Sequence, residues 1–417
     1  MKASILMLRG IEGCGVSRYA LEEQKWYTNH GIQCDIYAGN DKKWGRRNSQ
    51  ENNIIEFNNN EIISLKNKLN DEYDIVFYQS LPSKTGHSER YQNDCFEHLI
   101  CGVTRPIKIS HQNDHKLQSL SRNAFIWETM AEMDASFTHS LSSPFAKKMK
   151  EFNPSVPLLK MGLGFDFDEL LPYWKPIKEQ VKRISYFGRF AGFKDPGRIT
   201  EMQPLLEKYG IIGEMKGIER SIGSLDLFYD DVKDRKNTYK KNIFEVKKEA
   251  VIQTPDKVWI YGPYNRLEGI EDLSKSMFGA DFYHLDAEAY GDNMEFAMCE
   301  IISCGVIPVF DKHWADNCKH LNGNLFRDIK NFAIYSDKND LETTVMQMQE
   351  LASDNEMREK RRKDCFELAK EHCDNEIVYK KMHEDACKVI KRTLVKEEKR
   401  IDSTFKESVK PKAKSLF

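Results

Sequence analysis

The sequence predicts an α/β protein built on two parallel β-sheets. Short apolar runs alternate with segments of helical periodicity, and the same rhythm restarts in the second half of the chain. The first set of predicted strands is Lys2–Arg9, Gln33–Ala38, Asp74–Gln79, Ile107–Gln112 and Ala135–His139. The second set is Arg183–Phe187, Ile211–Lys216, Lys257–Tyr261, Ala280–Leu285 and Val306–Phe310. We therefore expect two Rossmann-like domains that face each other across one cleft.

Leu170–Pro176 lies between the two sets of strands and is typical of a linker. The predicted domains are residues 1–172 and 177–373, followed by a C-terminal helix and charged tail over 374–417. The charge-dense segment Asp230–Lys248 is typical of an exposed insertion. In sheets of this kind ligands bind at the carboxyl ends of the strands, so we expect the chemistry in the loops that follow them.

Composition excludes several classes of protein. The 417 residues are 40% hydrophobic and carry a net charge of −2, which does not suit non-specific coating of nucleic acid, although a local basic strip remains compatible with a DNA substrate. The ten cysteines form no Cys-x-x-Cys pair, so they indicate a reducing compartment and neither a disulfide framework nor a zinc site. No apolar run approaches the ~18 residues of a membrane span, and the chain begins directly with a strand, so we expect no membrane partner and no signal peptide.

The opening strand is followed by glycines and then by a helix that is predicted to stop at Gly31. Gly13, Gly15 and Val16 occupy the turn, where backbone N–H groups at a helix start can approach a phosphate. The third glycine of the dinucleotide fingerprint is missing, because Val16-Ser17-Arg18 follows Gly15. The alternative is that these glycines only turn the chain.

A second candidate follows the first strand of the second domain. Arg189 and Lys194 lie five residues apart on that loop and can grip a diphosphate from two sides. Two ordinary surface cations are the alternative.

The segment from Tyr290 to Phe310 is the strongest signal of the second half. Asn293 is predicted to cap a helix whose first N–H groups, from Met294 on, face a phosphate. Glu300 follows Asp292 by eight residues and is expected about two turns inside this helix, which ends at Gly305. An exposed helix acid is the alternative for Glu300.

Polar residues also follow other predicted strands. Asp114 and His115 can orient an acceptor hydroxyl or take its proton, or else Asp114 caps a helix. His111 and His139 are expected to be strand-end histidines with structural partners. Glu219 and Arg220 close another strand, where Arg220 reaches the diphosphate or the sugar, or else forms a structural ion pair.

A basic run surrounds an aromatic residue in the loop after the second strand. Cations with an interleaved aromatic ring suit phosphate contact and base stacking, whereas the alternative is a solvated loop. The residues are Lys42, Lys43, Trp44, Arg46 and Arg47.

In this order, the segments resemble the α-glucosyltransferases of T-even bacteriophages, which glucosylate hydroxymethylcytosine in DNA. The resemblance runs from residue 1 to about residue 370. It implies the GT-B glycosyltransferase fold, in which Asp292 and Glu300 match the acid-x7-acid signature of retaining enzymes. It is carried by Arg9–Ser17, Gln112–His115, Ser119–Leu120, Arg122–Asn123, Gly188–Arg189, Lys194, Gly217–Ser221, Leu273–Ser276, Glu295–Glu300, Cys304–Gly305 and Ile307–Phe310.

The resemblance implies a role for each matched residue. Gly13, Gly15 and Val16 lie near the donor phosphates and sugar. Arg189 and Lys194 neutralise the diphosphate leaving group, with Glu219, Arg220 and the helix start at Asn293–Met294 nearby. Glu300 holds the ribose, and Asp114 faces the acceptor hydroxyl with support from His115. The family tract reads Gln-His-Asp-His, and here Asn113 replaces its first His.

The implied reaction transfers a sugar from a UDP-sugar, glucose or a relative such as arabinose, to 5-hydroxymethylcytosine in double-stranded DNA with retention of configuration. UDP-sugar is the co-substrate, and no cofactor or metal is essential. The target base must be flipped out of the duplex, and the N-terminal domain receives the DNA. The expected location is the cytoplasm of the infected bacterial host. Two alternatives stay open: a glycosyltransferase for glycans or small molecules, and a non-enzymatic DNA-binding protein.

Overall fold

A computed structural model describes residues 1–7, 15–39, 54–79, 94–112, 129–139, 141, 144–188, 194–216, 251–253, 259–261, 266–283, 294–319, 323–389 and 391. The chain divides into two compact units. The first comprises Met1–Leu141, Phe145–Met161 and the chain from Tyr379 on, and the second is mainly Gly162–Val378. This division differs from the predicted boundary after residue 172, because Phe165, Phe167 and Leu170 are buried in the core of the second unit.

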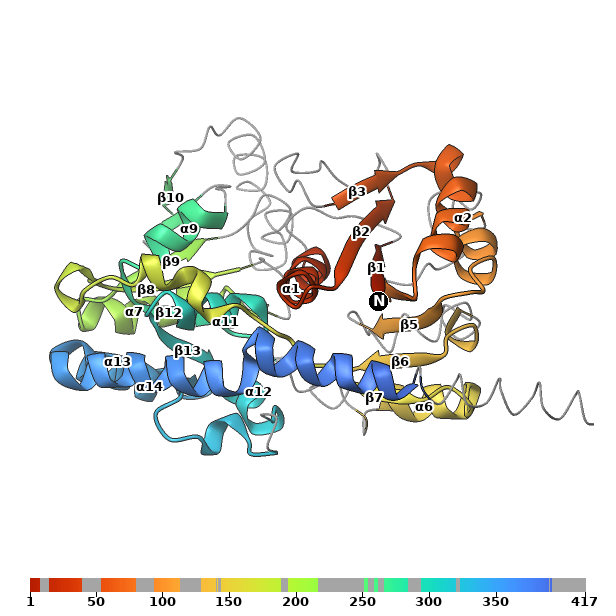
Figure 1. The fold of residues 1–417 in the computed structure, drawn as a ribbon. Helices are drawn as coiled ribbons and strands as arrows, with labels where there is room; N and C mark the ends of the chain where they lie inside the picture. The colour runs from red at the N-terminus through yellow and green to blue at the C-terminus, as the bar shows by residue number, and fades with distance from the viewer. Residues whose placement is uncertain are drawn as a thin grey trace, which may run out of the picture. The chain divides into compact units, whose positions relative to one another are not determined.

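The first unit contains a seven-stranded sheet in the order β3-β2-β1-β4-β5-β6-β7 (Figure 1). All neighbouring strands are parallel. The order reverses between β1 and β4, which is the switch point of a doubly wound sheet. The strands are β1 Lys2–Met7, β2 Gln33–Gly39, β3 Ile54–Phe57, β4 Ile75–Gln79, β5 Ile107–Gln112, β6 Ala135–Thr138 and β7 Leu158–Lys160.

Helix α1, Gly15–Asn29, directly follows the first glycine segment. It buries Tyr19, Trp26 and Tyr27, and it ends before Gly31, whose φ of +72° agrees with the predicted stop. The edge-on packing of Tyr379 against Tyr19 adds the helix over 375–389 to this core. The unit's other helical segments are η1 Asn59–Glu61, α2 Ile62–Glu72, η2 Cys95–Cys101 and α6 Pro144–Phe152.

The second unit repeats the architecture. Its seven-stranded sheet has the order β10-β11-β9-β8-β12-β13-β14, with β10 antiparallel and the other strands parallel. The switch point lies between β8 and β12, so loops at the carboxyl ends of these two strands flank the expected ligand position. The strands are β8 Val181–Phe187, β9 Ile212–Lys216, β10 Val251–Gln253, β11 Trp259–Tyr261, β12 Ser276–Asp281, β13 Ile307–Asp311 and β14 Ile334–Ser336.

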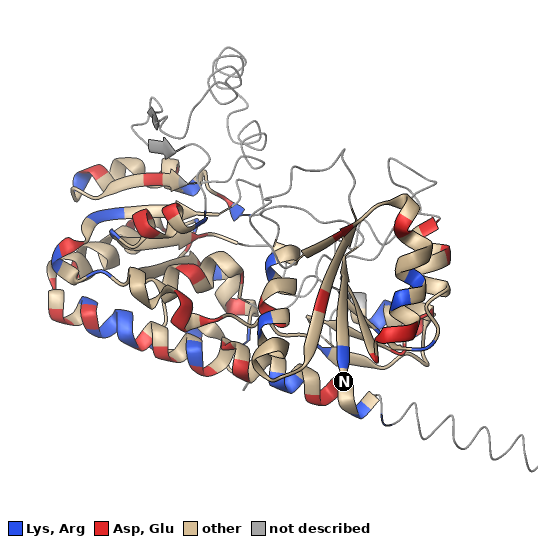
Figure 2. Cartoon of the chain, turned by 45° about the horizontal axis from the view of Figure 1, so that its top comes forward, with Lys and Arg blue, Asp and Glu red and all other residues tan. Residues whose placement is uncertain are grey.

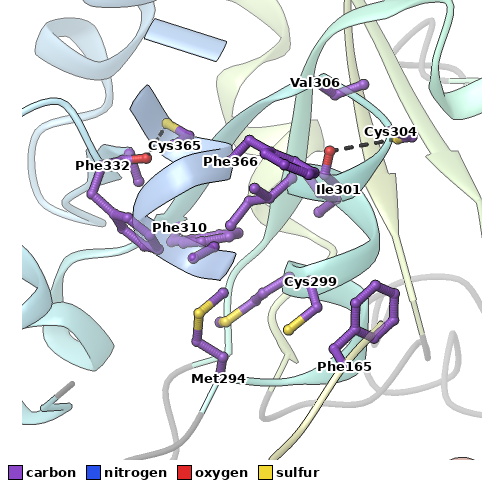
Figure 3. Packing of buried hydrophobic residues seen from close by; sticks show 14 of the residues in the cluster. Phe165, Met294, Cys299, Ile301, Cys304, Val306, Phe310, Phe332, Cys365 and Phe366 are labelled. Atoms are coloured by element: carbon purple, nitrogen blue, oxygen red, sulfur yellow. Dashed lines mark hydrogen bonds between the residues drawn. The ribbon is translucent and has the colours of Figure 1, made fainter. Parts of the chain in front are cut away.

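A sulfur-rich apolar core packs around helix α11, Phe296–Ser303 (Figure 3). Met294, Cys299 and Phe310 are buried there with Phe366 of α14. The cysteines that the structure describes are free. The helical segments of this unit are η3 Phe167–Tyr173, η4 Ile177–Glu179, α7 Arg198–Lys208, α9 Arg266–Leu273, α11 Phe296–Ser303, α12 Lys312–Asn317, η7 Phe326–Asp328, α13 Leu341–Ser353 and α14 Asn355–Cys373.

The structure also corrects the expected linker and one strand, and it adds strands that were not predicted. The expected linker Leu170–Pro176 overlaps η3, which is anchored because Phe167 and Leu170 are buried. The strand expected over Ala280–Leu285 is β12, Ser276–Asp281, and lies earlier in the chain. Strands β3, β7, β10 and β14 were not predicted, since runs of three or four residues are too short to establish a period.

None of the described helices is long and apolar enough to cross a lipid bilayer. Basic and acidic side chains are interspersed on the described helices, as along α14 (Figure 2).

Candidate functional site

Lys194 and Asp281 form a buried ion pair at the switch point of the second sheet. Asp281 is the last residue of β12 and is fully buried, and its Oδ2 lies 2.9 Å from Nζ of Lys194. The same Nζ lies 3.5 Å from Oε2 of Glu295 and 5.5 Å from the ring centroid of Tyr283. The predicted phosphate-gripping lysine is therefore a fixed cation and not a mobile surface residue.

Burial governs the charge of Asp281. Loss of hydration raises the pKa of this carboxyl, while the Lys194 ammonium lowers it and the Glu295 carboxylate raises it again. Asp281 also accepts a hydrogen bond of 3.1 Å from the backbone N–H of Tyr283, which lowers the pKa slightly. The pair holds Lys194 with its ammonium at the carboxyl ends of the strands.

Gly188 directly follows β8 on the other side of the switch point. Its φ is +147°, a backbone conformation that side chains with a Cβ rarely adopt. A Cβ added at Gly188 would lie 3.7 Å from the Cβ of Ala297 and 3.9 Å from Oδ2 of Asp281, so there is enough space for a small side chain. The backbone conformation is the reason for glycine here.

Helix α11 starts beside this cluster, but not where the sequence predicted. Its N-cap is Glu295, and the helix begins at Phe296, two residues later than a cap at Asn293 predicts. The Glu295 side chain makes no capping hydrogen bond and reaches Lys194 instead. The side chain of Met294 is buried in the apolar core (Figure 3), so only its backbone is available to a ligand.

Glu300 lies little more than one turn inside α11, and not two turns as predicted, because the helix starts later. It is buried, and the exposed helix acid is therefore the wrong alternative. Its Oε1 accepts a 2.5 Å hydrogen bond from Nε of Arg266, whose Nη1 donates to Oε1 of Glu169 at 2.7 Å. Burial alone lowers the pKa of Arg266, but the two carboxylates raise it above its ordinary value, so the arginine stays charged.

In the first unit, Gly15 and Val16 open α1 after β1, as the sequence predicts for a strand–turn–helix. His111 is buried with its Nδ1 3.4 Å from Oε2 of Glu23 and 3.5 Å from Nε2 of Gln79. Burial, with a smaller effect of His139, lowers the pKa of His111 to about 3, so the ring is neutral. The interpretation of His111 as a structural histidine is confirmed.

Many predicted site residues lie outside the described part of the chain, and their placement stays a prediction. The same holds for the insertion Asp230–Lys248 and for the chain after residue 391. The site residues concerned are Gly13, Lys42, Lys43, Trp44, Arg46, Arg47, Asp114, His115, Arg189, Glu219, Arg220 and Asn293.

Sequence reasoning missed the partners of the predicted residues. The sequence prediction put Asp281 inside a strand, whereas it is the last residue of β12. An acid at the carboxyl end of a strand is the signal that could have marked it as a site residue. Arg266 and Glu169 are 97 residues apart, and no spacing connects them to Glu300. Among the described residues, no group of His, Cys, Asp or Glu forms a metal-binding cluster.

Comparison with known proteins identifies the family. The family model for DNA α-glucosyltransferase matches residues 14–356. The chain belongs to the DNA α-glucosyltransferase family. The DNA α-glucosyltransferase of Enterobacteria phage T4 is 26% identical over 407 residues, covering 91% of this chain and 98% of the relative. The predicted resemblance to the α-glucosyltransferases of T-even phages and the predicted glycosyltransferase class are therefore confirmed.

Solved structures of this family share the fold. An α-glucosyltransferase in complex with UDP-glucose and DNA containing an abasic site is 25% identical and has a TM-score of 0.79, covering 92% of this chain and 98% of that chain. A complex with UDP and a 13-mer DNA containing an HMU base matches equally well. Trehalose-6-phosphate synthase from Burkholderia multivorans, 10% identical with a TM-score of 0.58 and covering 95% of this chain and 98% of that chain, shares the fold alone. The prediction of a GT-B glycosyltransferase fold is confirmed.

Proposed function

We propose that this protein transfers a sugar from a UDP-sugar to 5-hydroxymethylcytosine in double-stranded DNA, with retention of the anomeric configuration. The observation that carries the proposal is the match over most of the chain to α-glucosyltransferases that bind UDP-glucose and DNA. The buried cation Lys194 at the switch point of the second sheet supports the donor half of the reaction, because this is where nucleotides bind in such sheets.

Lys194 and Arg189 stabilise the diphosphate as the glycosidic bond breaks. Negative charge grows on the leaving oxygen in the transition state, so a fixed cation there accelerates the chemical step. Asp281 keeps the Lys194 ammonium in place. The N–H groups of the first turn of α11 add donors, since Glu295 does not cap them. Glu219 and Arg220 complete the diphosphate side, and Glu300 accepts hydrogen bonds from the ribose.

The acceptor half uses the loops of the first unit. Asp114, supported by His115, faces the hydroxymethyl group of a cytosine that has left the base stack, because a base inside a duplex cannot reach a buried donor. The start of α1, with Gly13, Gly15 and Val16, lies beside the donor phosphates and sugar. The hydroxyl attacks the face of the sugar from which the diphosphate leaves, which retains the configuration. The enzyme acts in the cytoplasm of the infected bacterial host.

The decisive experiment is mass spectrometry of nucleosides from hydroxymethylcytosine DNA incubated with the protein and a panel of UDP-sugars, including glucose and arabinose. A glycosylated hydroxymethylcytosine identifies both the acceptor and the sugar, and the anomer of the product tests retention. Transfer to a glycan or small molecule, with none to DNA, contradicts the proposal. DNA binding without any turnover of UDP-sugar contradicts it as well.

Two companion measurements test the other parts of the proposal. UDP-sugar is the one co-substrate, so EDTA should leave the transfer rate unchanged. A rate lost in EDTA and restored by a divalent ion would contradict this.

Replacing Lys42, Lys43, Arg46 and Arg47 by alanine should weaken DNA binding and make the binding constant depend less steeply on salt concentration. An unchanged slope would remove this loop from the DNA site.

A further inference from the structure

Arg266 connects two carboxylates from separate elements of the second unit. It lies at the start of α9, while Glu300 comes from α11 and Glu169 from η3. The Arg266 side chain is 29% exposed and that of Glu300 11%, so the contact between them is largely shielded from water. An ion pair in such surroundings holds its geometry more firmly than a surface pair, which often contributes little.

The contact restrains Glu300 without exhausting its capacity to accept hydrogen bonds. A carboxylate offers about four acceptor positions on its two oxygens. Nε of Arg266 uses one position on Oε1. The remaining positions allow the same carboxylate to accept bonds from two neighbouring hydroxyls, which is the chemistry that a ribose presents.

We propose that Arg266 is a positioning residue for the nucleotide: by holding Glu300 in one orientation it makes the protein select ribonucleoside diphosphates over nucleotides that lack the 2′- and 3′-hydroxyls. The inference rests on the proposed function, because it takes Glu300 as the ribose acceptor. Glu169 acts one step further away by orienting the guanidinium. Removal of Arg266 leaves two carboxylates without their shared cation.

The experiment measures the affinity for UDP and for 2′,3′-dideoxy-UDP by calorimetry. In the wild-type protein the dideoxy compound should bind at least about tenfold more weakly, because hydrogen bonds to a charged acceptor are lost. In Arg266→Ala, UDP binding should fall toward that of the dideoxy compound, whose affinity changes little, so that the ratio approaches one. Arg266→Lys should restore part of the ratio, and Glu169→Gln should reduce it less than Arg266→Ala does.

Arg183 provides a matched control in the same unit. It is a buried arginine on β8 that pairs with Glu214 at 3.2 Å and Asp272 at 3.3 Å. Arg183→Lys should lower the melting temperature without changing the ratio. An equal fall of the ratio in this variant would assign the Arg266 effect to general loss of structure and overturn the proposal.

Two further results overturn the proposal. One is a folded Arg266→Ala protein that keeps the wild-type ratio. The other is a wild-type protein that does not distinguish the two nucleotides. DNA transfer assays on the same preparations separate these results from a failure of the proposed function: transfer with no ribose selection removes only the Arg266 role, whereas absence of transfer and of UDP binding removes the donor site itself.

Discussion

The Lys194 ammonium stabilises the buried carboxylate of Asp281. Asp281 is fully buried, and an uncompensated carboxylate in that position is expensive, so removal of either partner changes more than one contact. Replacing a lysine that is paired in this way therefore destabilises the fold as well, and its variants need a partner substitution to be interpretable.

We expect Lys194→Ala to reduce kcat for transfer by about 100-fold or more, because the proposed diphosphate site loses one of its cations. The same variant should be less stable, since it buries Asp281 without its partner. The double variant Lys194→Ala/Asp281→Asn should recover the melting temperature and remain inactive. Recovery of transfer in the double variant, or full activity in the single one, would contradict the diphosphate role.

The stability of the single variant should also depend on pH. The folded-state pKa of Asp281 is raised by burial above its ordinary value of 3.8. A carboxyl whose pKa is raised on folding binds its proton more tightly in the folded state. The contribution of Asp281 to the free energy of unfolding is therefore fully present below pH 3.8, and it declines as the pH rises toward the folded-state pKa. Without Lys194 this decline should be steeper in thermal melts from pH 4 upward, and Asp281→Asn should abolish the difference. A melting profile parallel to that of the wild-type protein would contradict the pairing.

His111 has the opposite pH behaviour. Burial lowers its pKa from 6.5 to about 3, so the unfolded chain binds more protons between these values and acid destabilises the fold. At pH 5 this effect is about 2 kcal/mol. His111→Phe, which keeps a ring against Phe77 and Phe137, should lose this acid sensitivity in denaturant titrations at pH 8 and pH 5. Glu23, whose pKa burial raises, is retained in both proteins, so an equal acid effect in both would refute the assignment.

Helix α11 shows how one short element serves both the core and the site. Its N-cap Glu295 contacts Lys194, its middle carries Glu300, and its apolar side chains pack in the core. The helix has only eight residues, so tertiary packing and its end structure, more than helix propensity, must hold it. Changes at its ends should therefore reach the site.

Gly305→Ala tests the end of this helix. Gly305 has φ +74°, and a Cβ there meets Cδ2 of Trp174 at 2.5 Å, so both the backbone conformation and the space oppose a side chain. We expect a loss of about 2 kcal/mol or more in the free energy of unfolding. Gly210→Ala is a suitable control, because it shares a positive φ of +64° but has open space around it. Equal losses in the two variants would show that contact with Trp174 contributes nothing.

The molecule consists of two Rossmann-like units, and the last long helix of the described chain has residues in each of them. The helix over 375–389 begins in the second unit, yet from Tyr379 its residues belong to the first. Tyr379 and His383 pack against Tyr19 and Trp26 of α1, and the Tyr19 hydroxyl lies 3.2 Å from the Met382 sulfur. The first unit is therefore completed by residues far along the chain.

A chain that ends after Val378 should lose this cover over α1. Each large apolar side chain buried from water contributes about 1.5–3 kcal/mol, so the free energy of unfolding of the first unit should fall by several kcal/mol. Thermal unfolding followed by near-UV circular dichroism should show loss of its packing. A chain that ends after residue 391 is the control, because the sequence predicts a charged tail at this end of the chain. Similar melting of the two truncated proteins would contradict the packing role of the 375–389 helix.

Local pattern was sufficient for the repeated α/β architecture, for α1 and for the stop at Gly305, because burial of one face imposes a period that the chain displays directly. It also singled out Lys194 and Glu300 as candidate site residues, since both follow strands in a recognisable order. The local pattern did not predict the shortest strands, the start of α11 or the anchoring of η3 in the core. In each of these, contacts with residues distant in sequence outweigh the weak local preference.

The charge partners of Lys194 and Glu300 separate most clearly what the sequence shows from what only the tertiary structure decides. A lysine after a strand and an acid on a helix are visible along the chain, but the carboxylate that fixes Lys194 and the guanidinium that restrains Glu300 come from elements 87 and 34 residues away. Electrostatic pairing depends on distance in space and on exclusion of water. Folding alone brings these groups within reach of one another and removes the solvent that would otherwise screen them.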